Sequence, residues 1–372
     1  MTGVAFVLPN LRLGGQAELV RSASAEARRR GIAVTHVLPK TVALDDRAQL
    51  DRYRRETSLA GRLHHVLAIR GRLARLRSEA RPWIVVPAPS LVPLALWLAP
   101  SGPVVVHFEH SGSEMSSVPH EILRGVTTNA VKMLLTHRTV SFGGRNDRIV
   151  MVAGTAAAVR RLQSQSPRAT VFHLAQACDW DPPFPDPVDA RARLGLPRGV
   201  PVVGYAGHLF ATKGLATLLT AFRSLRERVR HVVLAIAASG EGALPSGTPE
   251  GVRTLGILDI PEFLRAIDVL ALPYLNLSST TLPPSLLLEA LAVGVPIVTS
   301  ALPDLKEVAT DDEASFSPAG DAAALADALE VALTRGVDRD ALAARQRTRT
   351  LALREQRASS PLWDHLASTW WS

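Results

Sequence analysis

Short runs of β-branched residues alternate with Ala- and Leu-rich stretches along the whole chain. This alternation is typical of βαβ units, in which helices join parallel strands. In the first half it predicts strands at 4–9, 33–39, 83–87, 104–110, 147–152 and 170–175. In the second half it predicts strands at 200–207, 231–238, 251–258, 268–273 and 296–300, with helices at 214–229, 260–267 and 284–294. The pattern therefore predicts two open α/β domains in tandem.

A proline-rich segment lies between the two halves. From Cys178 it reads CDWDPPFPDPVD, and prolines interleaved with acidic residues make a stiff, exposed connector. We place the domain boundary near Pro182–Val188. The first domain is then expected over 1–183 and the second over 188–357.

The composition is that of a globular protein, with 47% hydrophobic and 20% charged residues. The single cysteine, Cys178, excludes an internal disulfide and favours a reducing compartment. The N-terminus lacks the basic residues and the cleavage site of a signal peptide. The most apolar window, 83–108, contains five prolines, which argues against a membrane-spanning helix. We expect a cytoplasmic protein.

The positive charge is concentrated near the N-terminus. The net charge is +8, and residues 1–100 contain sixteen Arg or Lys against seven Asp or Glu. Much of this surplus lies in the leucine-rich stretch 47–83, which predicts a basic amphipathic helix or pair of helices. One interpretation is a solvated face. The other is a surface that docks either on an anionic membrane, which would be the inner face of the membrane, or on an acidic acceptor. Nucleic acid is not expected as a partner, because aromatic residues are not interleaved with the basic ones.

Glycines follow the first predicted strand. Gly14 and Gly15 open the next helix, where backbone N–H groups can approach an anion at the positive end of the helix dipole. The pattern is neither GxGxxG nor a Walker motif. A tight connection without a ligand is the alternative.

A lysine and a glycine, Lys213 and Gly214, stand between a strand and a helix in the second half. A cation at this position can stabilise the charge of a departing diphosphate. The alternative is an ordinary surface lysine.

One carboxylate interrupts the apolar run PSLLLEALAVGVPIVTS at 284–300. Burying an unpaired carboxylate is costly, so Glu289 is expected to face a ligand or an opening. On the first turns of a helix, it can accept hydrogen bonds from the vicinal hydroxyls of a ribose while the helix end holds phosphate. The alternative is a buried glutamate paired with an arginine.

Four segments of the second half carry a resemblance to a known family. GHLFATKG at 207–214 resembles a Gly-Arg-Leu-x-x-x-Lys-Gly element, and LLLEALAVGVPIVTS at 286–300 resembles the most recognisable stretch of that family. TLGILDIPEFLRAIDVLALP at 254–273 and FSPAGDAAALADAL at 316–329 are similar to two further elements. Together they resemble the retaining glycosyltransferase family 4, whose members use nucleotide-sugar donors. The resemblance covers nearly the whole chain.

The resemblance implies an architecture. It implies the GT-B type, in which two Rossmann-like domains face each other across a cleft, with the acceptor on the N-terminal side and the donor on the C-terminal domain. The last helix, at about 358–372, would cross back to the N-terminal domain. Trp363, Trp370 and Trp371 suit that docking.

The resemblance also implies roles for residues on the donor side. Lys213, helped by His208, would stabilise the diphosphate, and Glu289 would hold the ribose. Backbone amides around Gly15 and at Ser285–Leu286 would complete the anion site, and the segment Gly256–Leu258 would border the base. The remaining donor-binding candidates are Gly14, Gly15, Ile257, Leu258, Thr281, Ser285 and Leu286. Thr281 stands where the family has a second glutamate, and His208 where it has an arginine.

On the acceptor side, the candidates end the strand at 104–110. The resemblance favours His110 as a catalytic group, with His107 and Glu109 as alternatives, and a polar strand end without a catalytic role also fits. Alternation along a strand places His107 and Glu109 on one face and His110 on the other.

The sequence shows no metal-binding cluster, so no cofactor is expected beyond the nucleotide-sugar donor. The resemblance implies metal-independent transfer to an acceptor hydroxyl with retention of anomeric configuration. The acceptor, whether a small natural product, a glycan or a lipid, is not indicated. A non-catalytic nucleotide-sugar-binding subunit and a nucleotide-sugar epimerase of the same fold are the alternatives.

Overall fold

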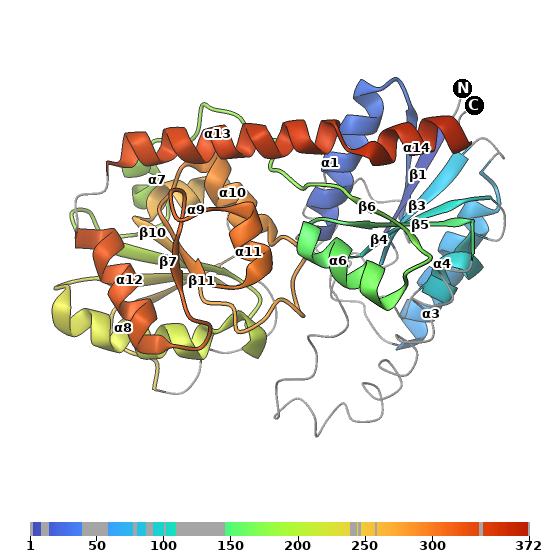
Figure 1. The fold of residues 1–372 in the computed structure, drawn as a ribbon. Coiled ribbons are helices and arrows are strands. Elements are labelled where there is room, and N and C mark those ends of the chain that lie inside the picture. The colour runs from blue at the N-terminus through green and yellow to red at the C-terminus, as the bar shows by residue number, and fades with distance from the viewer. Residues whose placement is uncertain are drawn as a thin grey trace. The chain divides into compact units, whose positions relative to one another are not determined.

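The computed structural model describes residues 3–8, 15–38, 59–76, 80–86, 92–99, 102–108, 146–238, 244, 247–256, 259–334 and 338–370. The chain forms two compact units, each containing a six-stranded parallel sheet with helices packed on it (Figure 1). Unit 1 comprises Met1–Gln176, Thr280–Ser285 and Glu355–Ser372, and unit 2 comprises Ala177–Ser279 and Leu286–Arg354. The predicted fold class is confirmed. In the described part of the chain, no helix has both the length and the apolar character needed to cross a membrane.

The sheet of unit 1 has the strand order β2-β1-β3-β4-β5-β6. Its strands are β1 Gly3–Val7, β2 Ala33–Val37, β3 Ala80–Val86, β4 Val104–Phe108, β5 Ile149–Ala153 and β6 Thr170–His173. Every residue of β4 and β5 is buried. Helices cover both faces of a parallel sheet, which explains the continuous apolar runs that predicted these strands.

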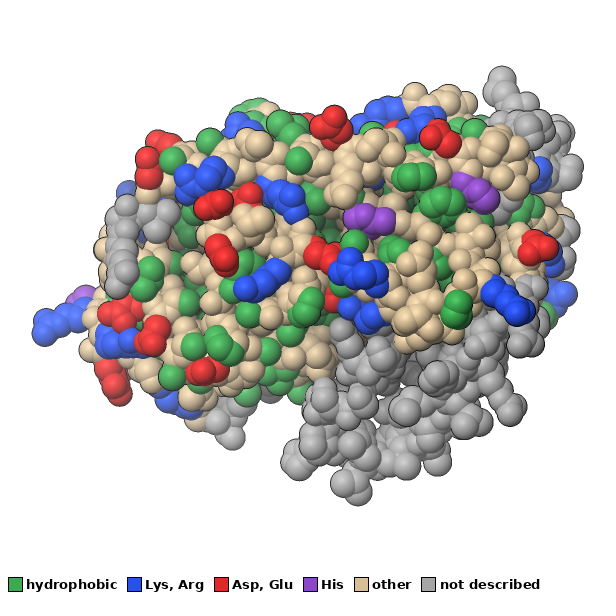
Figure 2. Space-filling view, viewed as in Figure 1, with side chains coloured by type: hydrophobic (Ala, Val, Ile, Leu, Met, Phe, Trp, Pro, Cys, Tyr) green, Lys and Arg blue, Asp and Glu red, His purple; other side chains and the backbone are tan. Residues whose placement is uncertain are grey.

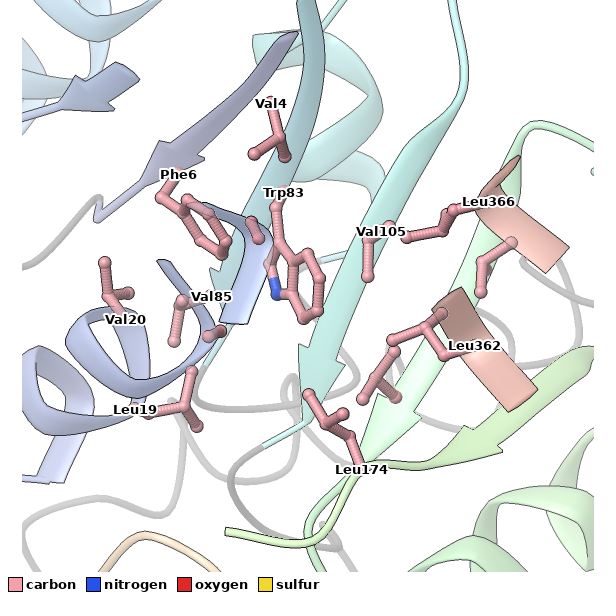
Figure 3. Packing of buried hydrophobic residues seen from close by; sticks show 14 of the residues in the cluster. Val4, Phe6, Leu19, Val20, Trp83, Val85, Val105, Leu174, Leu362 and Leu366 are labelled. Atoms are coloured by element: carbon pink, nitrogen blue, oxygen red, sulfur yellow. The ribbon is translucent and has the colours of Figure 1, made fainter. Parts of the chain in front are cut away.

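The described helices of unit 1 are α1 Gly15–Arg29, α3 Leu59–Leu73, α4 Val92–Leu98, α6 Ala156–Gln165 and α14 Pro361–Trp370. Helices α1 and α14 pack on the same face of the sheet (Figure 3). Phe6, Trp83 and Val105 project from three neighbouring strands into this layer, where they meet side chains of α1 and α14. The last helix therefore belongs to the core of unit 1.

One of the three tryptophans expected to dock the last helix, Trp363, packs in the core of unit 1, and the side chains of Trp370 and Trp371 lie outside the described residues. The Trp363 ring is buried, lies 5.8 Å from the Trp83 ring between centroids, and has the Arg30 guanidinium 5.2 Å from its centroid. Its Nε1 donates a hydrogen bond of 3.0 Å to the Arg357 carbonyl. The Ser360 hydroxyl donates to the His173 carbonyl at 2.7 Å. These contacts fix the turn between α14 and the preceding helix, α13 Arg339–Ala358.

The sheet of unit 2 has the order β12-β11-β10-β7-β8-β9. Its strands are β7 Val202–Gly207, β8 Val233–Ala238, β9 Val252–Leu255, β10 Val269–Leu272, β11 Ile297–Ser300 and β12 Ser315–Ser317. Its helices are α7 Pro187–Arg193, α8 Leu215–Arg228, α9 Ile260–Ala266, α10 Ser285–Val293, α11 Pro303–Val308, α12 Ala322–Thr334 and most of α13. The strand β12 and the helices α7, α11 and α13 were not predicted. Three and six residues, as in β12 and α11, are too few to show a period.

The limits of the units differ from the predicted domain limits. The first division lies between Gln176 and Ala177, before the proline-rich connector. The segment Thr280–Ser285, expected within the second domain, groups with unit 1. A tertiary contact explains this: the Gln176 side-chain amide donates to the Leu282 carbonyl at 3.0 Å.

Candidate functional site

The strand order of unit 2 creates a switch point between β7 and β10. From β7 the chain moves to β8 and β9 on one side, and it then returns to β10, β11 and β12 on the other. β7 and β10 are parallel neighbours, with Val269 paired to Val203. In open α/β sheets ligands bind at the carboxyl ends of the strands beside such a switch point, so the loops after β7 and β10 are the candidate site of unit 2.

The loop after β7 is shaped by two glycines. Gly207 has φ 135° and Gly214 has φ 71°, both in a region that favours glycine. A Cβ on Gly214 would lie 1.7 Å from the Pro273 carbonyl oxygen. Only glycine lets the short 3₁₀ turn Ala211–Lys213 end here and α8 begin directly against the strand β10. The glycine of the Lys-Gly pair is thus a packing requirement of the switch point.

Lys213 points back over the end of β7. Its Nζ lies 5.3 Å from the centroid of the Tyr274 ring and 3.7 Å from where a Cβ on Gly207 would stand. Desolvation by burial lowers the pKa of this ammonium to about 8. At neutral pH the group still carries its charge, and a desolvated cation gains more than a solvated one from an incoming anion. The alternative interpretation, an ordinary surface lysine, does not fit this environment.

The loops after β7 and β10 are bonded to each other. The Leu275 amide donates to the Thr212 carbonyl at 2.8 Å, and the hydroxyls of Thr212 and Ser279 share a short hydrogen bond. Tyr274, beneath the ammonium, is 3% exposed. Sequence reasoning missed Tyr274, Thr212 and Ser279. The only signal was their position after two strands that later proved to be neighbours.

His208 lies half-buried on the loop after β7, on the same loop as Lys213. Its ring centroid is 5.3 Å from that of Phe210, which is 38% exposed. Its carbonyl oxygen accepts a hydrogen bond of 3.2 Å from the Tyr205 hydroxyl. The backbone is therefore anchored in the core of unit 2. The imidazole can act as a neutral N–H donor or, when protonated, as a cation.

The helix α10 follows β10 and carries the carboxylate that interrupts the apolar run. Most of α10 is buried, and Gly294 ends it with φ 83°. Ser285, Leu286 and Glu289 are only half-buried, and their spacing places them on one face of the helix. Glu289 thus lies on the less covered side of α10, and its contact with a ligand or an opening stays a prediction.

Two of the predicted donor-binding residues group with unit 1. The hydroxyls of Thr281 and Ser285 lie 3.5 Å apart, and Thr281 is 8% exposed. Their segment packs closely on the end of β5, because a Cβ on Gly154 would lie 2.1 Å from the Leu282 carbonyl oxygen. By contrast, Lys213, His208, Leu286 and Glu289 belong to unit 2.

The remaining candidates have different outcomes. Gly15 is the first residue of α1, which follows β1 at the switch point between β1 and β3 of unit 1. This position agrees with a role for its amide, which stays a prediction. The other five positions lie outside the described residues: Gly14, Glu109, His110, Ile257 and Leu258.

His107 lies in the apolar layer of unit 1. It pairs with Val85 and Val152 in register, and it is fully buried. Within the described residues, neither ring nitrogen has a hydrogen-bond partner. Desolvation lowers the pKa of this imidazole to about 3, so it is neutral at physiological pH. A group so placed suits a core position better than contact with an acceptor.

The described residues contain no group of three or more His, Cys, Asp or Glu side chains that could hold a metal ion. Three of the groups that the sequence singled out belong to unit 2: Lys213 and His208 on the loop after β7, and Glu289 on the helix after β10. They are a desolvated cation, an imidazole and a carboxylate. This set suits a ligand that carries both phosphate and hydroxyl groups.

Comparison with known proteins identifies the segment that contains this site. Residues 200–335 match the family model "Glycosyl transferases group 1". A D-inositol 3-phosphate glycosyltransferase from Xylanimonas cellulosilytica is 33% identical over 156 residues, which cover 36% of this chain and 34% of that protein. A phosphatidyl-myo-inositol mannosyltransferase from Mycobacterium leprae is 35% identical over 136 residues, 34% of this chain and 36% of that protein. The match thus spans about a third of each relative.

The solved structures with a similar fold cover almost the whole chain. Sucrose-phosphate synthase from Thermosynechococcus elongatus gives a TM-score of 0.71 with 16% identity, over 99% of this chain and all of that one (100%). Anabaena Alr3699/HepE in complex with UDP-glucose gives 0.67 with 17% identity, over 99% and 100%. WaaG, a glycosyltransferase involved in lipopolysaccharide biosynthesis, gives 0.64 with 17% identity, over 95% and 98%. At these identities the likeness concerns the fold, which is of the GT-B type.

Proposed function

We propose that the protein transfers a sugar from a nucleotide-diphosphate sugar to an acceptor hydroxyl, because residues 200–335 match the model of the group 1 glycosyltransferases and the chain has the GT-B fold. One observation carries the proposal. The Lys213 ammonium is desolvated against Tyr274 at the β7–β10 switch point. A cation held there suits a diphosphate, the charged part common to all such donors.

The roles of the other donor-side residues follow from the same chemistry. His208 donates to the diphosphate beside Lys213, and Glu289 accepts hydrogen bonds from the ribose hydroxyls. The amides of Ser285 and Leu286 at the start of α10 add to the anion site. Thr281 supplies a hydroxyl rather than a carboxylate toward the donor sugar. The amides near Gly14 and Gly15, and Ile257 and Leu258 beside the base, complete the site.

The reaction breaks the bond between the anomeric carbon and the diphosphate oxygen. The electron pair of that bond goes to the diphosphate, and positive charge develops on the sugar. Lys213 stabilises the departing charge without a metal ion. The acceptor oxygen bonds to the anomeric carbon on the face the diphosphate leaves, and the acceptor proton passes to the leaving phosphate oxygen. Retention of configuration follows from this geometry, with His110 as the group that contacts the acceptor.

The donor is proposed to be a hexosyl nucleotide of the UDP-glucose kind, as in the complex of HepE. The named acceptors of the two relatives, D-inositol 3-phosphate and phosphatidyl-myo-inositol, are the first to try. The matched segment contains the donor side, so the acceptor does not follow from it. Glycans and small hydroxylated natural products belong in the same screen.

The test measures donor binding and turnover in the whole chain. Binding is followed by thermal shift with UDP, GDP and their sugars, since a ligand of the folded state raises its melting temperature. Turnover is followed as nucleotide release with and without acceptor. A chelator keeps the concentration of free divalent metal ions in the low nanomolar range. Lys213→Ala is expected to lower kcat/KM by about 10²–10³-fold. The matched control is Lys306→Ala, which removes an exposed lysine of unit 2 that also lies over a ring, 5.1 Å from Phe316.

Three outcomes would contradict parts of the proposal. Equal activity of Lys213→Ala and Lys306→Ala would remove the role of Lys213. Inversion at the anomeric carbon of the product, read by NMR, would exclude the retaining mechanism. Donor binding without turnover for every acceptor would favour a nucleotide-sugar-binding subunit, the alternative suggested by Thr281 in place of a carboxylate.

A further inference from the structure

Two large apolar side chains are exposed on neighbouring helices of unit 1. Leu67 of α3 is 58% exposed and Trp97 of α4 is 39% exposed. Both helices already use another side for the core, where Ile69 on α3 and Leu98 on α4 are fully buried. A large part of each of these apolar side chains therefore faces solvent. We call the exposed surface of α3 and α4 that carries them the α3–α4 face.

An arginine lies over the tryptophan ring and one helical turn from the leucine. The guanidinium of Arg70, one helical turn from Leu67, lies 4.3 Å from the centroid of the Trp97 ring. At this distance the cation and the ring attract each other, and Arg70 is half-buried. Arg75 on the next turn is exposed. Apolar and cationic groups thus share one surface.

The charge of this face has one sign. The described side chains of α3, α4 and their ends, at 66–76 and 92–99, include three arginines and no Asp or Glu. Arg72 donates a hydrogen bond to the Leu38 carbonyl, so Arg70 and Arg75 are the cations of this face. The face shown in Figure 2 contrasts with this, because basic and acidic side chains are mixed across it. An acid-free basic face is complementary to an anionic surface and unsuited to a basic one.

We propose that the α3–α4 face docks on the surface of a membrane that contains anionic lipids. A tryptophan and a leucine among arginines match the interfacial region of a bilayer, where indole rings lie at the headgroups and guanidinium groups bond to lipid phosphates. A protein partner fits less well, because stable protein interfaces bury on the order of 1,000 Å² or more with an apolar centre. Among the described residues of α3 and α4, the large exposed apolar side chains are two, Leu67 and Trp97. The protein is held on the membrane by peripheral contact alone.

The experiment is flotation of the full-length protein with vesicles. Vesicles of phosphatidylcholine with phosphatidylglycerol are compared with vesicles of phosphatidylcholine alone, at low salt and at high salt. The wild-type protein is expected to float with the anionic vesicles and to be released by salt, because screening weakens its attraction. The double variant Leu67→Ser/Trp97→Ala is expected to partition roughly tenfold more weakly.

The matched control is Leu351→Ser, which removes a leucine that is 53% exposed on α13 within unit 2. It is expected to float like the wild type. Circular dichroism checks that every variant is folded. Nucleotide release from the donor is measured in solution on the same samples. Since neither Leu67 nor Trp97 belongs to the donor site, this activity is expected to persist, so failure here and failure of the proposed function are separate results.

Several outcomes would overturn the docking proposal. One is absence of flotation, or equal flotation with neutral vesicles. Another is equal loss in Leu351→Ser. A third is that Leu67→Ser/Trp97→Ala floats like the wild type while Arg70→Gln/Arg75→Gln no longer floats. This result would indicate attraction to any polyanion rather than an interfacial anchor. Retention of the protein by an acidic polypeptide in preference to the vesicles would indicate a protein partner instead.

Discussion

The Lys213 ammonium lies 5.3 Å from the centre of the Tyr274 ring, across the boundary between the loops that follow β7 and β10. The ring attracts the cation, but burial costs it part of its hydration, and the net result is a pKa lowered to about 8. The lysine is therefore protonated at neutral pH and titrates within a range that binding experiments can reach.

We expect donor affinity to fall as the pH rises through about 8, the pKa of Lys213. Below that pH the ammonium is present to meet the diphosphate, and above it the free enzyme must first take up a proton. The loss approaches tenfold per pH unit above the pKa, and isothermal titration of UDP between pH 6.5 and 10 measures it. Lys213→Arg should bind with little pH dependence over this range, because arginine stays protonated. A fall of the same size in Lys213→Arg would assign the titration to another group.

A second prediction concerns Gly214. Substitution to alanine puts a Cβ 1.7 Å from the Pro273 carbonyl oxygen at a residue with φ 71°. Relief requires the β7 and β10 loops to separate, so we expect Gly214→Ala to lower the free energy of unfolding of unit 2 by about 2–4 kcal/mol. Lys213 would move away from Tyr274, and donor turnover would fall as well.

The control for Gly214→Ala is Gly195→Ala. Gly195 has a similar φ of 64° in the same unit, but a Cβ there meets nothing within 4 Å. It isolates the conformational cost, about 1 kcal/mol, from the clash. Urea unfolding of the two variants measures the difference. Equal losses would show that the close approach to Pro273 is not what requires glycine.

The sequence predicted the architecture and two of the groups proposed for the site. Every described strand with four or more residues was predicted, because parallel strands buried on both faces produce apolar runs that can be recognised without tertiary information. Lys213 and Glu289 were found because a cation before a helix and a carboxylate in an apolar run conflict with their surroundings.

The sequence was not sufficient for contacts that depend on strand order. Tyr274 and Ser279 meet Lys213 and Thr212 only because β10 inserts beside β7, which no local pattern encodes. The grouping of Thr280–Ser285 with unit 1 rests on a hydrogen bond from Gln176, far away in the chain. A surface lysine and a desolvated lysine likewise look the same in sequence.

A third prediction concerns His107. Its pKa is lowered to about 3 in the folded state from an ordinary value of 6.5. Between these values the unfolded chain binds a proton that the folded chain does not, so His107 makes the protein lose stability as the pH falls below 6.5. Its contribution is fully present above that pH. His107→Leu removes the imidazole without leaving a polar group unpaired, so the variant should be more stable than the wild type at pH 5. Between pH 7.5 and pH 5, the difference in the free energy of unfolding between the two proteins should shift by about 2 kcal/mol in favour of the variant.

The measurement is urea unfolding of both proteins at the two pH values, with hydrogen exchange of β4 and β5 as a probe specific to unit 1. His231→Asn is the control. His231 is exposed, with φ 60°, a conformation that asparagine tolerates. An identical pH dependence in His107→Leu and the wild type would mean that this imidazole does not titrate between the folded and unfolded states.

The last prediction concerns Trp363, which belongs to the C-terminal helix but to the core of unit 1. Its ring packs on Trp83, receives Arg30 on its face and bonds to the Arg357 carbonyl. Trp363→Ala leaves a cavity between α14 and the sheet, and we expect a loss of about 3–5 kcal/mol in the free energy of unfolding of unit 1. Hydrogen exchange should quicken in β1, β3 and β4 while β7, β8 and β10 of unit 2 keep their protection. Trp363→Phe, which keeps a ring but loses the hydrogen bond, should lose less. Equal quickening in both units would show instead that they unfold as one cooperative body, and unchanged protection in unit 1 would show that α14 is not part of its stable core.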